Sequence, residues 1–198
     1  MSPTAAGSYA PAAVLCGLAG WVPPRVVTNE HLARRLDTDD AWIRTRTGIR
    51  RRHAVDPGQA TSDLAVEAGR RALVCAATAS VDAVVVATTT PDHSCPATAP
   101  AVAARLGLTG AAAFDISAVC TGFVYGLASA AGLIAAGVAE RVLLIGRTPT
   151  PRSWIPSTGP TRSSSATARE PSSCAPDTPT SPARSATSTS AATALTRT

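Results

Sequence analysis

The sequence contains no lysine, so all 18 of its basic residues are arginine. This arginine-only, alanine-rich usage is typical of a GC-rich coding sequence. Aromatic residues make up only 4% of the chain. Most of the net charge of +5 lies after residue 146, where 6 Arg against 2 acidic residues give +4, and the only aromatic residue there is Trp154. No basic stripe interleaved with aromatic residues is present, which argues against nucleic-acid binding.

Long hydrophobic runs are also missing. The longest apolar stretch near the N-terminus, Ala10 to Val22, is interrupted by Pro11 and by glycines, and no basic region precedes it. We therefore predict neither a signal peptide nor a membrane span. The five cysteines form no C-x-x-C pair and no zinc-ligand spacing, which favours a reducing cytoplasm and gives no metal site.

Several catalytic motifs are absent as well. The chain has no G-x-G-x-x-G loop, no Walker A loop, no H-E-x-x-H and no G-x-S-x-G. Nucleotide-binding and serine-hydrolase functions therefore lose most of their support. Two thiols on apolar faces, Cys16 and Cys75, are predicted to be core residues. The three histidines are scattered and are predicted to be surface or packing residues.

The composition changes abruptly near Gly146. Of the 52 residues that follow, all but seven are Ala, Arg, Pro, Ser or Thr. A segment with so few large apolar residues cannot offset its ordering entropy by burial. We predict a loose arm over residues 1–10, a globular domain over 11–146 and a disordered tail over 147–198.

Within the globular part, hydrophobic periodicity predicts alternating strands and helices. A continuous apolar run such as 81–88 is the mark of a strand buried on both faces. The alternation indicates a layered α/β fold with parallel strands. The stretch 44–52 holds five arginines and is interpreted as a solvated helix end and loop, or as an anion site. We predict strands at 12–19, 81–88, 111–116 and 141–145, and helices after Thr28, from Asp39-Asp40 to Gly48, and at 61–78, 97–106 and 122–136.

Cys120 is the strongest candidate for a reactive residue. It lies where the strand ending at Ile116 gives way to the helix beginning at Gly122, and we place it in the first helical turn. Unpaired N–H groups and the positive end of the helix dipole favour a thiolate there. The alternative is a buried thiol that acts as a small hydrophobic residue. Reactive residues of parallel sheets follow the carboxyl ends of strands, which favours the nucleophile.

Three segments carry a family resemblance. They are W-I-R-T-R-T-G-I-R-R-R-H at 42–53, V-V-V-A-T-T-T-P-D-H-S-C-P-A-T-A-P at 84–100 and D-I-S-A-V-C-T-G-F-V-Y-G-L at 115–127. In their order and spacing they resemble beta-ketoacyl-acyl-carrier-protein synthase III over residues 12–146. The resemblance implies the N-terminal half of a thiolase-like layered α/β fold of two similar halves, and a homodimer. It also implies an enzyme of fatty-acid or polyketide synthesis that condenses an acyl-CoA primer with malonyl-acyl-carrier-protein and releases CoA and carbon dioxide, without a further cofactor.

The resemblance also assigns roles to individual residues. It implies that Cys120 accepts the acyl group as a thioester and that Trp42 stacks on the CoA adenine. Thr38 and Arg46 would contact the nucleotide end of CoA. Cys95 would lie near the dimer contact and the acyl pocket. Alternatives within the fold are a polyketide starter-loading or ester-forming synthase. Outside it, the alternatives are a non-catalytic remnant and a module that binds acyl-CoA or a partner.

The resemblance stops after Ile145-Gly146. The family uses a His and an Asn from its C-terminal half, and neither motif is found after Gly146. Reading the tail codons in a shifted frame permits a continuation typical of the family, A-D-T-Y-S-T-I-V-D-P-E-H-R-A-N-A-V-I-F-G-D-G-A-G-A-V-V-L-R. Our hypothesis is therefore a frameshift near the codons for Gly146 and Arg147, which predicts a chain inactive in condensation.

Overall fold

A five-stranded mixed sheet forms the centre of the computed structural model, which describes residues 13–148 and 189–197. The strand order is β1-β7-β6-β4-β5. Strands β4, β5 and β6 are parallel, and β7 runs antiparallel to both of its neighbours. The bounds are β1 Ala13–Trp21, β4 Ala83–Ala87, β5 Ala112–Ile116, β6 Arg141–Thr148 and β7 Thr189–Arg197.

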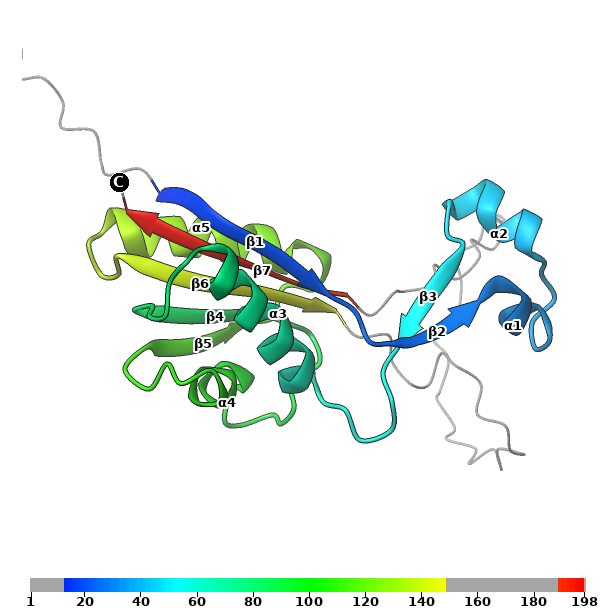
Figure 1. Ribbon diagram of the computed structural model, residues 1–198, viewed down its shortest axis with the longest axis horizontal. Coiled ribbons are helices and arrows are strands. Elements are labelled where there is room, and N and C mark those ends of the chain that lie inside the picture. Colours follow the sequence, from blue (N-terminus) through cyan, green and yellow to red (C-terminus); the bar gives the residue numbers. More distant parts are fainter. Residues whose placement is uncertain (1–12, 149–188, 198) are drawn as a thin grey trace, which may run out of the picture.

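Helices cover both faces of the sheet (Figure 1). Helices α3 (Thr61–Cys75) and α4 (Thr98–Arg105) pack on one face, and α5 (Gly122–Ala135) packs on the other. Alternate residues of the central strands therefore enter two separate cores: Val84 and Val86 contact the α3 and α4 side, and Val85 contacts the α5 side. The predicted layered α/β fold is confirmed.

A smaller unit precedes α3. It consists of the hairpin β2 (Arg25–Thr28) and β3 (Arg51–Ala54) with two short helices, α1 (Asn29–Ala33) and α2 (Asp40–Thr47). Both helices begin at capping side chains, because Thr28 Oγ1 accepts from His31 N at 3.3 Å and Asp39 Oδ1 accepts from Trp42 N at 2.6 Å. Gly48 ends α2 with a φ of 71°, a left-handed conformation that favours glycine.

The expected helices and strands of the globular part are confirmed, with ends that differ by a few residues. The prediction was wrong for part of the basic stretch, because residues 51–54 form β3 and pair with β2 instead of forming a solvated loop. Arg52 is buried there, and its Nη1 donates to Asn29 Oδ1 at 2.7 Å. A side-chain amide thus offsets part of the cost of burying this guanidinium.

The prediction of disorder after residue 146 was also wrong for two segments. Strand β6 continues through Arg147 and Thr148, and residues 189–197 form β7 between β1 and β6. Neighbouring strands satisfy the backbone of β7 on both sides, and its residues 192–195 are buried. Backbone pairing therefore makes up for the lack of large side chains. Residues 149–188, like the expected arm at 1–10, lie outside the described residues.

Arg147 is an unusual residue for the end of a buried strand. It is only 3% exposed, its Nη1 donates to Thr61 Oγ1 at 3.1 Å, and its Nε has no hydrogen-bond partner. No carboxylate within the described residues forms an ion pair with it. Burial lowers the pKa of Arg147 to about 10, although Asp92 and Asp63 act in the opposite direction. A charged, incompletely paired group therefore lies in the core at neutral pH.

Replacing this charge by an apolar side chain of similar length should stabilise the fold. We expect Arg147→Met to raise the free energy of unfolding by about 1 to 2 kcal/mol, because a buried charge without a counter-ion costs more than an apolar group. Thermal unfolding followed by circular dichroism measures the change. Arg71→Met on the exposed side of α3 is the matched control and should change stability by less than about 0.5 kcal/mol. A loss of stability in Arg147→Met alone would contradict the expectation.

Candidate active site

Cys120 lies in a single turn of 3-10 helix, Val119–Thr121, which joins β5 to α5. The prediction that Cys120 belongs to the first turn of the long helix was therefore wrong, because a separate short helix holds it just before α5. Gly122 N donates to Val119 O, so the turn leads directly into α5. The thiol is exposed, which disagrees with the alternative of a buried hydrophobic cysteine.

The backbone just before Cys120 is strained. Val119 has a φ of 45°, in the left-handed region that β-branched residues avoid. Its side chain is also 74% exposed. Non-glycine residues in this region cost of order 1 to 3 kcal/mol and tend to occur at functional sites. The conformation therefore marks the turn that presents Cys120 as a candidate site.

The turn lies at the carboxyl edge of the parallel strands. Strands β4, β5 and β6 all end on the side where the α1 and α2 unit lies (Figure 1). Thr88 N donates to Ile116 O at 3.0 Å and ties the two strand ends together. Cys120 follows β5 at this edge, as the parallel topology predicted.

Helix α5 approaches the sheet closely through glycines. A Cβ atom added at Gly126 would overlap the Leu144 side chain, and one at Gly146 would lie 2.6 Å from Phe123 Cδ2. One at Gly122 would only touch Ala87 Cβ at 3.4 Å. Because Cys120 is joined to the start of this helix, the glycine contacts position the thiol as well.

The loop that carries Cys95 is fixed to the same edge. Asp115, in β5, accepts hydrogen bonds from the first backbone N–H groups of α4, with Thr98 N at 2.7 Å and Ala99 N at 2.8 Å. Asp92 N in turn donates to Thr98 Oγ1 at 3.1 Å. Cys95 lies between these anchors and is exposed. Its assignment to a dimer contact and acyl pocket stays a prediction.

A second cluster lies on α2. Arg46 Cζ stands 4.8 Å from the centre of the Trp42 ring, a cation–π contact between residues one turn apart. Trp42 is 38% exposed, so part of the indole is accessible. Thr38 lies two residues before α2, and its Oγ1 is buried without a hydrogen-bond partner. The structure thus brings Trp42 and Arg46 together and leaves the Thr38 hydroxyl unsatisfied.

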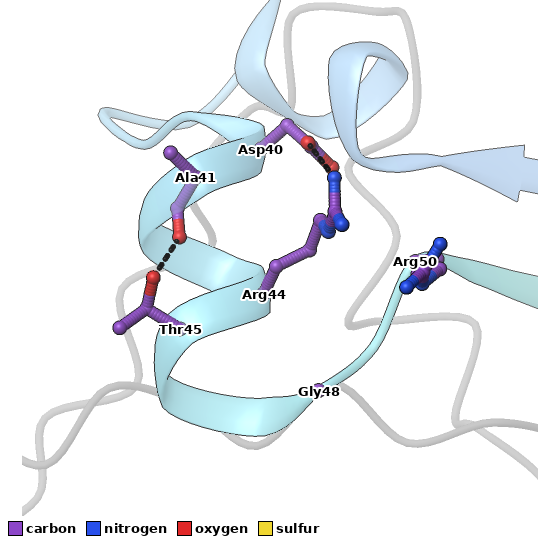
Figure 2. A pocket seen from close by; sticks show the side chains of 6 residues that line it. All are labelled: Asp40, Ala41, Arg44, Thr45, Gly48 and Arg50. Carbon is purple, nitrogen blue, oxygen red and sulfur yellow. Dashed lines mark hydrogen bonds and ion pairs between the residues drawn. The ribbon is translucent and has the colours of Figure 1, made fainter.

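A hollow of about 440 Å³ lies beside this cluster (Figure 2). Asp40 and Arg44 form an ion pair at 3.3 Å at its edge, and Asn29 Nδ2 donates to Asp40 Oδ1 at 2.8 Å. The hydrogen bond from Asn29, with a smaller contribution from Arg44, lowers the pKa of Asp40. The lining residues are Asp40, Ala41, Arg44, Thr45, Gly48 and Arg50.

The prediction of core positions for Cys16 and Cys75 was wrong, because both thiols are exposed. Cys16 is the extra residue of a bulge on the edge strand β1, and Cys75 ends α3 beside the exposed Val74. Apolar periodicity does not reveal such a bulge or helix end. Within residues 13–148 and 189–197, no three His, Cys, Asp or Glu side chains gather around a common point. In the same ranges no helix has the length and apolar character needed to cross a membrane.

Comparison with known sequences identifies relatives of the chain. The family described as 3-oxoacyl-[acyl-carrier-protein] synthase III matches residues 114–155. Beta-ketoacyl-[acyl-carrier-protein] synthase III 5 of Streptomyces coelicolor is 64% identical over 135 residues, which are 68% of this chain and 40% of that protein. The chain thus spans about two fifths of the length of this curated relative.

Solved structures agree with the sequence comparison. The crystal structure of 3-oxoacyl-(acyl carrier protein) synthase III from Pseudomonas aeruginosa superposes with a TM-score of 0.73 at 43% identity, over 93% of this chain and 51% of that one. The priming beta-ketosynthase of the R1128 polyketide biosynthetic pathway gives a TM-score of 0.74 at 25% identity, over 98% and 53%.

The fold is therefore the thiolase-like fold of condensing enzymes, present over part of its length. Within that class, the matched part of the chain belongs to the beta-ketoacyl-acyl-carrier-protein synthase III family.

Two glycines of α5 allow a test of how the helix is seated. Gly126→Ala should destabilise the fold by about 1 to 3 kcal/mol, because the new methyl group overlaps the fully buried Leu144. Gly132→Ala meets no atom within 4 Å and should stabilise the same helix by about 0.5 to 1 kcal/mol. Chemical denaturation measures both changes. Equal effects of the two substitutions would show that α5 is not seated as described.

Proposed function

We propose that this sequence encodes an acyltransferase of the beta-ketoacyl-acyl-carrier-protein synthase III type, in which Cys120 is the acyl acceptor. The observation that carries the proposal is the exposed thiol in a strained turn, at the carboxyl edge of three parallel strands and directly before α5. Family membership of the matched residues supports it. The substrates are an acyl-CoA primer and malonyl-acyl-carrier-protein.

The first step is acyl transfer to the thiol. The Cys120 thiolate attacks the carbonyl carbon of the acyl-CoA thioester, a new carbon–sulfur bond forms, and the bond to the CoA sulfur breaks. The CoA thiolate leaves and takes up a proton from solvent. Decarboxylation of the malonyl group then supplies the carbon nucleophile that cleaves the acyl-Cys120 thioester. No cofactor beyond these substrates is proposed.

The CoA nucleotide is proposed to bind on α2. The exposed part of the Trp42 ring offers a stacking surface for adenine, and Arg46 holds one positive charge directly beside it. The Thr38 hydroxyl, two residues before the same helix, is unpaired but buried, so a contact with CoA would require this side chain to turn outward. Trp42 and Arg46 thus support a nucleotide-binding role for α2 rather than a purely structural one.

Acylation of Cys120 can be tested without condensation. The purified chain is incubated with radiolabelled acetyl-CoA, quenched in acid and analysed for protein-bound label. We expect label in the parent chain and its loss in Cys120→Ala, because this thiol lies in the strained turn between β5 and α5. Cys75→Ala is the matched control and should keep the label, since Cys75 is also exposed but lies at the end of α3. Label that survives Cys120→Ala would refute the assignment.

A second candidate within the same fold is a polyketide starter-loading or ester-forming synthase. The similarity to a priming beta-ketosynthase, with a TM-score of 0.74, favours it. Acyl-CoAs of different chain length, tested in the same labelling assay, separate the two candidates by their preferred primer. A chain that binds acyl-CoA and never acylates Cys120 would instead be a non-catalytic acyl-CoA-binding module.

For the complete protein we further propose a cytoplasmic homodimer. The scattered free thiols favour a reducing compartment. Among the described strands, β5 is an edge of the sheet and pairs only with β4, so its other side offers a row of backbone groups to another chain.

The frameshift hypothesis also remains a proposal. Arg147 supports it, since a partly unsatisfied guanidinium in a buried strand is the first residue after the proposed break. We propose that restoring the shifted frame after Gly146 replaces Arg147 by alanine and returns condensing activity. Resequencing the gene across this codon tests whether the reading frame is shifted there.

Expression of the restored reading frame tests whether condensing activity returns. We expect release of carbon dioxide from malonyl-acyl-carrier-protein by the restored protein and none by the present chain, because decarboxylation needs the His and Asn expected from the C-terminal half. Carbon dioxide release by the present chain would contradict this expectation, and a reproducible unshifted gene sequence would remove the frameshift.

A further inference from the structure

Two exposed thiols lie where the first part of β1 meets the end of α3. Cys16 is the extra residue of the bulge in β1, and Cys75 is the last residue of α3. Both thiols are free, and the acyl transfer proposed for Cys120 uses neither of them. The pair is therefore available for chemistry of its own.

The backbones of β1 and α3 touch beside these two cysteines. A Cβ atom added at Gly17 would lie 2.7 Å from Ala76 N and 2.8 Å from Ala72 O, so any larger residue at this position would overlap the helix. Gly17 directly follows Cys16, and Ala76 directly follows Cys75. Each cysteine is thus covalently joined to one partner of this contact, and the missing side chain of Gly17 brings the two cysteine backbones together.

The Cys16 side chain is on the face of the sheet that α3 covers. It lines a second hollow, of about 230 Å³, together with Ala76 and Ala77 at the end of that helix. Its thiol donates to Val14 O at 3.7 Å, which is a long and weak hydrogen bond. The thiol can therefore leave this contact at little cost and turn toward α3.

Cys75 lies on the flank of α3 nearest to β1. Residues two apart on a helix point in nearly opposite directions, and Leu73 is buried in the core that α3 shares with α4. Helix α4 covers β4 and β5, whereas α3 lies over β1 and β7 at the other side of the sheet. The flank opposite Leu73, which carries Cys75, therefore faces the β1 edge.

Both segments are held in place by backbone hydrogen bonds. Thr78 N donates to Leu73 O at 3.1 Å and closes the last turn of α3, which holds Cys75. Strand β1 pairs with β7 on either side of the bulge at Cys16. The two thiols thus stay near each other in the folded chain and do not depend on a chance encounter.

We propose that Cys16 and Cys75 form a thiol pair that peroxide oxidises to a disulfide, which links β1 to α3. One thiolate attacks a peroxide oxygen, the O–O bond breaks, and a sulfenic acid and a hydroxide ion form. The other thiolate then attacks the sulfenic sulfur, so that the S–S bond forms, the S–O bond breaks and a second hydroxide ion leaves. Each hydroxide ion takes up a proton released by a thiol, and the products are one disulfide and two molecules of water.

This disulfide is a reversible modification, separate from the acyl-transfer site. Disulfides that form in a reducing compartment are transient, and many serve in redox sensing. Strand β1 runs in the same direction as β6, because both are antiparallel to β7, and the Cys16 bulge lies toward its amino end. Cys120 follows the carboxyl edge of the parallel strands, so the pair can be oxidised without involving the acyl acceptor. The inference goes beyond the proposed function and does not depend on acyl-CoA.

The test is peptide mapping of the full chain after oxidation with hydrogen peroxide. Trypsin cleaves after arginine, which places Cys16 in peptide 1–25 and Cys75 in peptide 72–105. Peptide 72–105 also contains Cys95, so the mapping uses the Cys95→Ser variant, in which Cys75 is the only thiol of that peptide. A folded sample and a sample in concentrated urea are oxidised in parallel, alkylated with iodoacetamide and digested without reductant.

We expect mass spectrometry to find peptides 1–25 and 72–105 joined in the folded sample, and dithiothreitol to separate them. In urea the same link should be about fivefold less abundant, because closing a long loop of unfolded chain costs entropy. Cys16→Ser and Cys75→Ser should each abolish the link. Cys120→Ala is the matched control and should keep it, since it removes an exposed thiol from the opposite edge of the sheet.

Thermal unfolding gives a second readout of the same link. Oxidation should raise the midpoint of unfolding by about 5 to 10 °C, because the disulfide restricts the unfolded chain. Dithiothreitol should reverse the rise, and Cys16→Ser should not show it. Unfolding of each variant before oxidation shows that the fold is kept.

Three results would overturn the proposal. The first is a folded sample in which the two peptides stay separate after oxidation. The second is Cys16 joined mainly to a cysteine other than Cys75, in the same chain or in another. The third is equal linkage in the folded and urea samples, since the fold would then contribute nothing to the pairing.

Discussion

Burial of the central strands on both faces is the constraint on which the rest of the structure depends. Residues 83–87 of β4 and 142–145 of β6 are almost free of solvent contact, so each face needs its own helical cover. This places α3 and α4 on one side and α5 on the other. Parallel strands connected in this way end at a common edge, and there the chain leaves β5 through the strained turn at Val119. The position of Cys120, the candidate nucleophile, thus follows from the packing of the sheet.

Much of this arrangement could be predicted from the sequence, because its signals are local. Local sequence is enough to predict a strand from the apolar run at 81–88. It is also enough to predict the helix starts at Thr28 and Asp39 and the helix end at Gly48. The place of Cys120 between a strand and a helix could be predicted, because apolar periodicity marks both elements. The 3-10 turn could not be predicted, because a single irregular turn produces no periodic pattern of apolar residues.

The remaining features depend on contacts between distant segments. Arg52 is buried because Asn29, 23 positions earlier, accepts its hydrogen bond, and nothing in the string of arginines distinguishes it from its exposed neighbours. Cys16 is exposed because β1 bulges at the sheet edge. The hollow on α2 requires Arg50, beyond the end of that helix, to lie across from Arg44. The composition of the tail predicted disorder for β7 as well. This strand is ordered because it pairs with two neighbouring strands, not because of its own side chains.

Strand β7 shows which features of a strand the middle of this sheet requires. A strand between β1 and β6 needs an extended backbone with small side chains, and several amino acids can supply these. The alanine and threonine residues of β7 meet this requirement. Side-chain identity therefore contributes less to the order of this strand than backbone pairing does, and the middle of the sheet is continuous without a run of large apolar residues there.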